Sequence, residues 1–346
     1  MIRDSDIKLH VPEPIPYDWA ETGYFNFYIP EANIFGFVYI VHRAGIGATI
    51  SDVEIVDRAG FSTDDAVYID LINHNPLVAR AEDFQLATGL GFRAKSIREY
   101  DIAYSAGGVD LHLECLSLME PYDIHDPTMD PMAAADGAAS SESTGFGDAY
   151  SAHFDMTVRM RGTLKLAGRE YLIDCVSTMD HSWGVRPENG FHPILWANAH
   201  FGSNYSVHAI FSVDRHAPVG QQHAFKHGYA LVDGKVRGAK AGSVGTIRDG
   251  LFPTTMQMTI VDCDDREHVL NGSVLTHHPW MPYGNNLSPI TMTRWYAADG
   301  RIGIGTYLEG FPLNRLRPSP DNGARWQAPT AKEDVRPLLQ RQGTAE

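Results

Sequence analysis

The sequence lacks any hydrophobic run long enough to cross a membrane, since no segment approaches 18 uncharged apolar residues. Its opening, MIRDSDIKLHVPEPIP, also lacks the apolar core of a signal peptide. Positive charge is scarce, because 28 Lys and Arg face 43 Asp and Glu and the formal net charge is -15. Such an acidic chain is unsuited to nucleic acid and to anionic membrane surfaces. We therefore expect a soluble cytoplasmic protein that binds neither and takes a small hydrophobic ligand.

Cysteine is scarce as well. The chain has three, Cys115, Cys175 and Cys263, and no two of them form a CxxC pair. Each stands in a strand-like run of residues. We therefore expect buried thiols in a reducing compartment.

Several catalytic signatures are missing. HExxH is absent, and the adjacent His277 and His278 cannot easily bind one ion from a strand, so we expect no metal. RIGIGTY continues as a strand instead of leading into a helix, which argues against a nicotinamide or flavin cofactor. GxSxG is absent too, so serine hydrolase chemistry has no support. The chemistry is expected to need no cofactor.

Short alternating segments rich in β-branched and aromatic residues recur along the chain, whereas helical periodicity is nearly absent. This pattern predicts an all-β fold of antiparallel strands in barrels or sandwiches. The 346 residues suggest two domains, and small polar residues at 129–148 mark a boundary. We predict an N-terminal β-domain over 10–145, a C-terminal β-domain over 149–315 and a peripheral tail over 316–346.

Two strand predictions place polar side chains on defined faces. In LWANAHF, alternation sets Trp196, Asn198 and His200 on one face. In the hairpin around Asp299 and Gly300, we predict a two-residue turn, which fixes how the two strands pair. This pairing would place four polar side chains on one face as a wall, with two glycines that leave space beside them. The side chains predicted to share that wall, with Tyr296 opposite Gly303 and Arg294 opposite Gly305, are Arg294, Tyr296, Tyr307 and Glu309.

The stretch TMDHSWGVRP carries the strongest candidate chemistry. Asp180 and His181 are adjacent, so in a strand they point to opposite faces and only one of them faces a given cavity. Asp180 is either a general acid or base with a pKa raised by burial, or a structural carboxylate paired with Arg186. His181 is either a proton shuttle or a structural histidine. Trp183 either stacks on a ligand or packs in the core.

This stretch, together with WANAHFG and the earlier ETGYFNFYIPEANIFGFVYI, resembles the lipocalin-like family that includes the bacterial carotenoid 1,2-hydratases (hydroxyneurosporene synthases). The resemblance spans most of residues 17 to 312. It implies two consecutive lipocalin-like β-barrels or sandwiches, a ligand cavity near their junction, and no organic cofactor. The motif match carries over Asp180, His181, Trp183, Gly184 and Arg186 as the signature of an uncharacterised branch.

We therefore expect a cofactor-independent lyase, either a hydratase or dehydratase or a retro-aldol enzyme, acting by acid/base catalysis on an aromatic or terpenoid molecule. The catalytic candidates are Asp180, His181, His200 and Tyr296. The substrate-binding candidates are Trp183, Arg186, Trp196, Asn198, Arg294, Tyr307 and Glu309. A carrier of hydrophobic ligands and an isomerase or cyclase stay open as alternatives, and so does the choice between a monomer and a homodimer.

Overall fold

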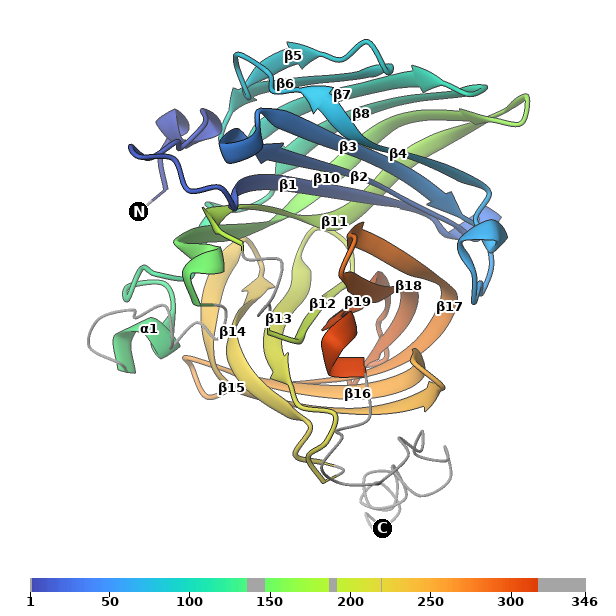
Figure 1. Ribbon diagram of the computed structural model, residues 1–346. Helices are drawn as coiled ribbons and strands as arrows, with labels where there is room; N and C mark the ends of the chain where they lie inside the picture. Colours follow the sequence, from blue (N-terminus) through green and yellow to red (C-terminus); the bar gives the residue numbers. More distant parts are fainter. Residues whose placement is uncertain (1, 136–146, 187–191, 219, 317–346) are drawn as a thin grey trace, which may run out of the picture.

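A computed structural model describes residues 2–135, 147–186, 192–218 and 220–316. Strands make up most of this part of the chain and form two antiparallel sheets, one above the other in Figure 1. The predicted all-β, lipocalin-like fold is confirmed. The predicted tail lies outside the described residues except for its first position, and so does most of the predicted linker.

The first sheet is an open, curled sheet of eleven strands. Its order is β4-β3-β2-β1-β11-β10-β8-β7-β6-β5, and β9 pairs with β10 beyond β8. The strands are β1 (Trp19–Ile29), β2 (Ile34–Arg43), β3 (Ala48–Val56), β4 (Tyr68–Pro76), β5 (Asp83–Gln85), β6 (Leu90–Ser96), β7 (Glu99–Ala106), β8 (Val109–Ser117), β9 (Tyr122–Asp123), β10 (Ala152–Leu166) and β11 (Arg169–Val185).

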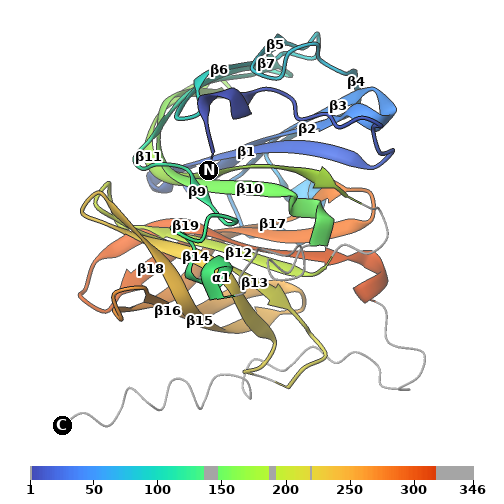
Figure 2. The same ribbon diagram turned by 90° about the vertical axis from the view of Figure 1, so that its left-hand side faces the viewer.

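The second sheet is a closed barrel in which eight strands follow one another in chain order and β12 closes against β19. Closure leaves no exposed sheet edge. Figure 2 shows the barrel below the first sheet from a second direction. Its strands are β12 (Ile194–His200), β13 (Tyr205–Val213), β14 (His223–Val232), β15 (Lys235–Asp249), β16 (Phe252–Asp262), β17 (Glu267–Tyr283), β18 (Asn286–Ala297) and β19 (Ile302–Pro312).

Helical segments are short throughout the described residues. None of them is long and apolar enough to cross a membrane. They are α1 (Pro131–Ala135) and the 3-10 turns η1 (Asp4–Ile7), η2 (Pro30–Ala32), η3 (Ala44–Ile46), η4 (Thr63–Asp65), η5 (Gly147–Tyr150) and η6 (Leu313–Leu316).

The change from one sheet to the other falls between β11 and β12, after residue 185. This differs from the division that composition predicts at 145–149, because β10 and β11 pair with β8 and β1 inside the first sheet. The long β10–β11 hairpin supplies the middle of that sheet. The polar run at 129–148 therefore lies between strands of one sheet and does not separate the two sheets. The separation into two folding units stays a prediction.

Two cores hold the molecule together. Leu195, Trp295 and Phe311 are buried inside the barrel with their neighbours. The other core joins the first sheet to outward-facing barrel residues such as Trp280 and Leu308. Because the outer wall of the barrel is buried against the first sheet, the region between the sheets is shielded from water over much of its area.

Strand alternation is regular where one face is solvated. In β8, Leu111, Leu113 and Cys115 are buried, whereas the residues between them are exposed. The expected buried thiol is therefore confirmed for Cys115. It is wrong for Cys263, which is exposed because it lies in the turn after β16.

The predicted register of the β18–β19 hairpin is wrong by one residue. The N–H of Ala297 bonds the carbonyl of Arg301 at 3.0 Å, so the loop holds three residues instead of two. Trp295, not Tyr296, therefore pairs with Gly303. A one-residue slip turns every side chain of a strand to the other face.

The two glycines of β19 do not leave a space either. A Cβ on Gly305 would lie 2.0 Å from the carbonyl oxygen of Asn198, and one on Gly303 would lie 2.3 Å from that of His200. The glycines instead allow the backbones of β12 and β19 to approach closely where the barrel closes.

Candidate functional site between the two sheets

A cavity with a volume of about 70 Å³ lies between the first sheet and the barrel. That space accommodates several waters or part of a ligand. Aromatic rings form much of its wall: Tyr24, Tyr39, Tyr150, Trp196, Trp280 and Tyr283. Its polar lining includes Thr22, Asp180, Ser182, Arg186, Asn286 and Ser288.

A larger hollow with a volume of about 450 Å³ adjoins this cavity. The two share Arg186, Pro282, Tyr283 and Asn286 in their walls. Ligand sites of drug-sized molecules typically occupy 300–1,000 Å³, so the hollow is large enough for the body of a ligand. A molecule seated there would reach the aromatic cavity past Arg186 and Tyr283.

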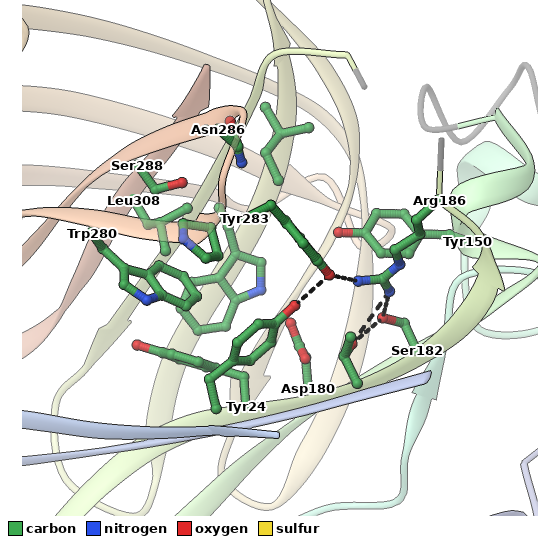
Figure 3. Close-up of a pocket in the computed structure, with 16 residues that line it drawn as sticks. Tyr24, Tyr150, Asp180, Ser182, Arg186, Trp280, Tyr283, Asn286, Ser288 and Leu308 are labelled. Atoms are coloured by element: carbon green, nitrogen blue, oxygen red, sulfur yellow. Dashed lines mark hydrogen bonds between the residues drawn. The ribbon is translucent and has the colours of Figure 1, made fainter. Parts of the chain in front are cut away.

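Asp180 lies in β11, with Tyr24 of β1 and Asp155 of β10 as its direct neighbours on the adjoining strands. Figure 3 shows its carboxyl projecting between Trp280 on one side and Arg186 on the other. Its buried Oδ1 has no hydrogen-bond partner among the described residues. Burial raises the pKa of Asp180 to about 6. The carboxyl can thus gain or lose a proton near neutral pH.

Asp155 has the opposite surroundings. Its Oδ2 lies 2.8 Å from Nε2 of His153 and 3.2 Å from Nε2 of His208, and its Oδ1 accepts a hydrogen bond from Nε1 of Trp196 at 3.0 Å. Burial alone would raise the pKa of Asp155, but the two imidazoles outweigh it and hold the pKa well below its ordinary value. Asp155 therefore stays ionised, and its negative charge adds to the raised pKa of Asp180.

Arg186 follows β11 and is buried at the edge of the cavity. Its Nη1 donates to Oη of Tyr283 at 2.9 Å, and its Nη2 donates to the hydroxyls of Ser182 and Thr22. Tyr283 in turn lies 2.9 Å from Oη of Tyr39. Within the described part of the chain Arg186 forms no ion pair with Asp180 or with another carboxylate. A buried cation with neutral partners favours an anionic oxygen beside it.

His181 lies on the opposite face of β11 from Asp180, as the alternation predicts. Trp183 shares the face of His181. Nε2 of His181 lies 2.9 Å from Oε1 of Glu21. The ring of Trp183 stacks on His10 at a centroid distance of 3.7 Å. The structure therefore does not bring these two candidates to the aromatic cavity, and the Arg186 pairing considered for Asp180 does not form.

Trp196, Asn198 and His200 share one face of β12, as predicted. This face meets the first sheet. Trp196 lines the cavity, whereas Asn198 accepts the N–H of Thr306 at 3.0 Å. His200 lies 3.0 Å from Oδ1 of Asn198 and 2.9 Å from Oγ of Ser206. Burial lowers the pKa of His200 to about 3, so its imidazole stays neutral. Asn198 and His200 are thus engaged in hydrogen bonds beside the cavity instead of lining it.

The predicted wall of four polar residues does not form, because the slipped register separates its members. Tyr296 is 41% exposed, and Arg294, which shares its strand face, is half-buried. Tyr307 and Glu309 are fully buried inside the barrel. There Glu309 pairs with Arg248, and neither residue lines the cavity.

Several residues of the site escaped the sequence analysis. Tyr24, Trp280 and Tyr283 line the cavity, and Asp155 supports it from β10. Strand alternation from Asp180 could have suggested that a facing residue on a partner strand matters. It could not have named that residue, because the pairing of β10 with β11 and of β1 with β11 fixes which side chains are neighbours.

Residues 3–309 match a family described as a domain of unknown function, DUF7064. The chain belongs to this family. No curated protein matches it in sequence.

Two solved structures are similar to this DUF7064 protein. One is kievitone hydratase from Nectria haematococca, with a TM-score of 0.51 and 10% identity over 89% of this chain and 92% of that one. The other is a putative AttH from Nitrosomonas europaea, with a TM-score of 0.51 and 13% identity over 84% of this chain and 92% of that one. At such identities the likeness concerns the fold.

Proposed function

We propose that this protein is a cofactor-independent lyase that uses Asp180 to add water to, or remove it from, a hydrophobic aromatic or terpenoid molecule. The observation that carries the proposal is the carboxyl of Asp180, which faces an aromatic cavity with a pKa of about 6 and whose Oδ1 has no hydrogen-bond partner in the described part of the chain. The general rule is that two carboxyls whose pKa values are driven apart divide acid and base roles. Here Asp155 stays charged and Asp180 exchanges the proton.

In the hydration direction, protonated Asp180 gives its proton to one alkene carbon. A water then bonds the neighbouring carbon and returns a proton to the Asp180 carboxylate, so the enzyme ends as it began. Dehydration is the reverse. The carboxyl needs a pKa near the working pH for both halves, because it must be acid in one step and base in the other.

Arg186 is proposed to hold an oxygen of the substrate. Its guanidinium is buried among neutral hydroxyls at the junction of the cavity and the hollow. If the alkene is conjugated to a carbonyl, water instead bonds the far carbon before Asp180 protonates the near one. Negative charge then grows on the carbonyl oxygen until that proton arrives, and the water's extra proton passes to the Asp180 carboxylate. A preorganised donor in a dry site stabilises such charge much more than water does.

The structural likeness to kievitone hydratase supports this class of reaction, since a protein with this fold carries that name. A retro-aldol cleavage would use the same acid and base. The alternatives without proton transfer, a carrier or a cyclase acting by shape, leave the unpartnered Asp180 carboxyl without a role.

The proposal is tested by incubating wild type and Asp180→Asn with terpenoid, steroid and phenolic compounds, and following thermal shift and product mass. We expect a compound that stabilises both proteins but gains or loses 18 Da, about one water, only with wild type. Loss of a small aldehyde would identify the retro-aldol reaction. Stabilisation of both with unchanged mass and unchanged chromatographic retention would favour the carrier and contradict the lyase.

A further inference from the structure

Three side chains with metal-binding atoms meet on the face of β11 that points away from Asp180. Glu21 is buried on β1, His181 lies on β11, and His10 belongs to the segment before β1. Oε1 of Glu21 lies 3.0 Å from Nδ1 of His10 and 2.9 Å from Nε2 of His181. One donor atom from each residue lies within 4.8 Å of the other two.

We propose that His10, Glu21 and His181 form a binding site for one divalent transition-metal ion of the Zn²⁺ type. Two imidazoles and one carboxylate are a donor set that such ions accept, with bonds of about 2.0–2.2 Å. Donor atoms bound to one tetrahedral ion at those lengths lie roughly 3.3 Å apart. The separations of 2.9 and 3.0 Å from Oε1 of Glu21 must lengthen slightly to admit the ion, and the two imidazole nitrogens lie within 4.8 Å of each other.

The surroundings of the three side chains already fix their orientation as ligands. Oε2 of Glu21 accepts the backbone N–H of His10 at 2.7 Å, which leaves Oε1 toward the two imidazoles. The other ring nitrogen of His10, Nε2, lies 3.6 Å from Oδ1 of Asp6. At this distance Asp6 is a charged neighbour of the ring and not a hydrogen-bond partner, and its negative charge favours a cation bound at Nδ1. Trp183 stacks on the same ring with its plane within 4° of parallel.

Charge and space also fit an ion. Glu21 and Asp6 together supply two negative charges, which balance a divalent cation. A small cavity with a volume of about 30 Å³ lies beside the three side chains. Glu21, His181 and His42 line it. That space is enough for one or two waters. Three protein ligands and a water would complete a four-coordinate site.

Bound there, the ion would fasten the amino-terminal segment to the first sheet. The segment already reaches the β6–β7 turn, where Asp4 accepts the N–H of Ile97 at 3.0 Å. Figure 1 shows it lying along one end of the sheet beside β1 and β6. Because His10 comes from this segment and the other two ligands from paired strands, the ion would join parts of the chain that sequence separates by about 170 residues.

The test uses the full-length protein, stripped with a chelator and titrated with Zn²⁺ alone by calorimetry, with metal content measured after gel filtration. We expect one Zn²⁺ per chain and a Tm that rises by several degrees. His10→Ala should lower the affinity at least tenfold, since one of three ligands is lost. His10 also contacts Glu21 and stacks on Trp183, so the zinc-dependent rise in Tm of each protein is measured from its own zinc-free Tm, and His10→Ala should show no rise.

Two controls separate this site from other possibilities. His112→Gln, at an exposed position of β8, should bind Zn²⁺ like wild type. Asp180→Asn should also bind it normally, so failure of the lyase proposal would leave this result untouched. Co²⁺ provides a second readout, because its visible absorption reports imidazole coordination. Binding well below one ion per chain for both metals, or equal binding by His10→Ala, would overturn the site.

Discussion

Asp180 and Asp155 are direct cross-strand neighbours on β11 and β10, yet their carboxyls are driven to opposite protonation behaviour. His153 and His208 hold the pKa of Asp155 low, whereas burial without a partner raises that of Asp180 to about 6. Side chains that face each other across antiparallel strands have Cβ atoms about 4.5–5.5 Å apart. The pair therefore places a fixed negative charge beside a carboxyl that can exchange a proton in the cavity.

Removing the ionisable group at position 180 should stabilise the protein at neutral pH. The folded pKa of about 6 exceeds the ordinary value of 3.8, so the contribution of Asp180 to folding stability is greatest below about pH 4 and falls as the pH rises toward 6. Two pKa units correspond to about 3 kcal/mol. In urea unfolding, Asp180→Asn should be up to about 3 kcal/mol more stable than wild type at pH 8, with little difference at pH 4. Equal pH profiles for the two proteins would contradict the raised pKa.

Arg186 should matter for turnover more than for folding. Arg186→Lys keeps the charge but cannot reach Tyr283, Ser182 and Thr22 with the same planar set of donors. We expect kcat/KM on a compound from the screen to fall by about 10²-fold, as for a lost oxyanion donor. Arg159→Lys, which alters an exposed ion pair with Asp174, is the matched control. Similar kinetics for both variants would remove Arg186 from the proposed site.

The ion pair inside the barrel should be structural. Burial would raise the pKa of Glu309, but Arg248 and His223 outweigh it and lower it to about 2. The stabilisation is thus fully present above pH 4.5 and is lost as the pH falls toward 2. Glu309→Gln should cost about 3–5 kcal/mol at pH 7, because a buried Arg248 loses its counter-charge.

The cost of Glu309→Gln should shrink when denaturant unfolding is repeated below pH 4.5. Glu114→Gln on the exposed face of β8 should change neither value. A cost that stays constant down to pH 3 would show that the carboxylate charge is not what stabilises the barrel.

The closure of the barrel can be tested at a glycine. Gly305→Ala puts a Cβ 2.0 Å from the Asn198 carbonyl oxygen, so β12 and β19 must separate. We expect a loss of several kcal/mol or an unfolded barrel, because backbone cannot move aside as a flexible side chain does. Gly284→Ala meets no atom within 4 Å and should be tolerated. Circular dichroism melting distinguishes the two.

Local pattern was sufficient for part of this structure. The period of two along a strand predicted that Asp180 and His181 face opposite ways, and that Trp196 and its polar neighbours share a face. Strands β11 and β12 confirm both. It also predicted the all-β fold. These are properties of a few consecutive residues, and the backbone geometry of a strand fixes them.

Relationships between distant segments could not be obtained in this way. An Asp-Gly pair suits both two-residue and three-residue loops, so the hairpin register at Asp299 was wrong and the predicted wall with it. Trp280 and Tyr283 reach the cavity only because β17 packs across the first sheet, and no local signal marks that packing. His10 and His181 meet for a similar reason, because β1 pairs with β11, and no metal-binding motif marks them in the sequence.

The proposed lyase chemistry depends most directly on Asp180 being a carboxyl that titrates near neutral pH, and this can be measured without knowing the substrate. The aspartates would be labelled with ¹³C at Cγ, and the Asp180 resonance assigned as the one missing from Asp180→Asn. We predict a titration midpoint of about 6. A midpoint below 4, typical of an ordinary carboxylate, would contradict the proposed acid/base role.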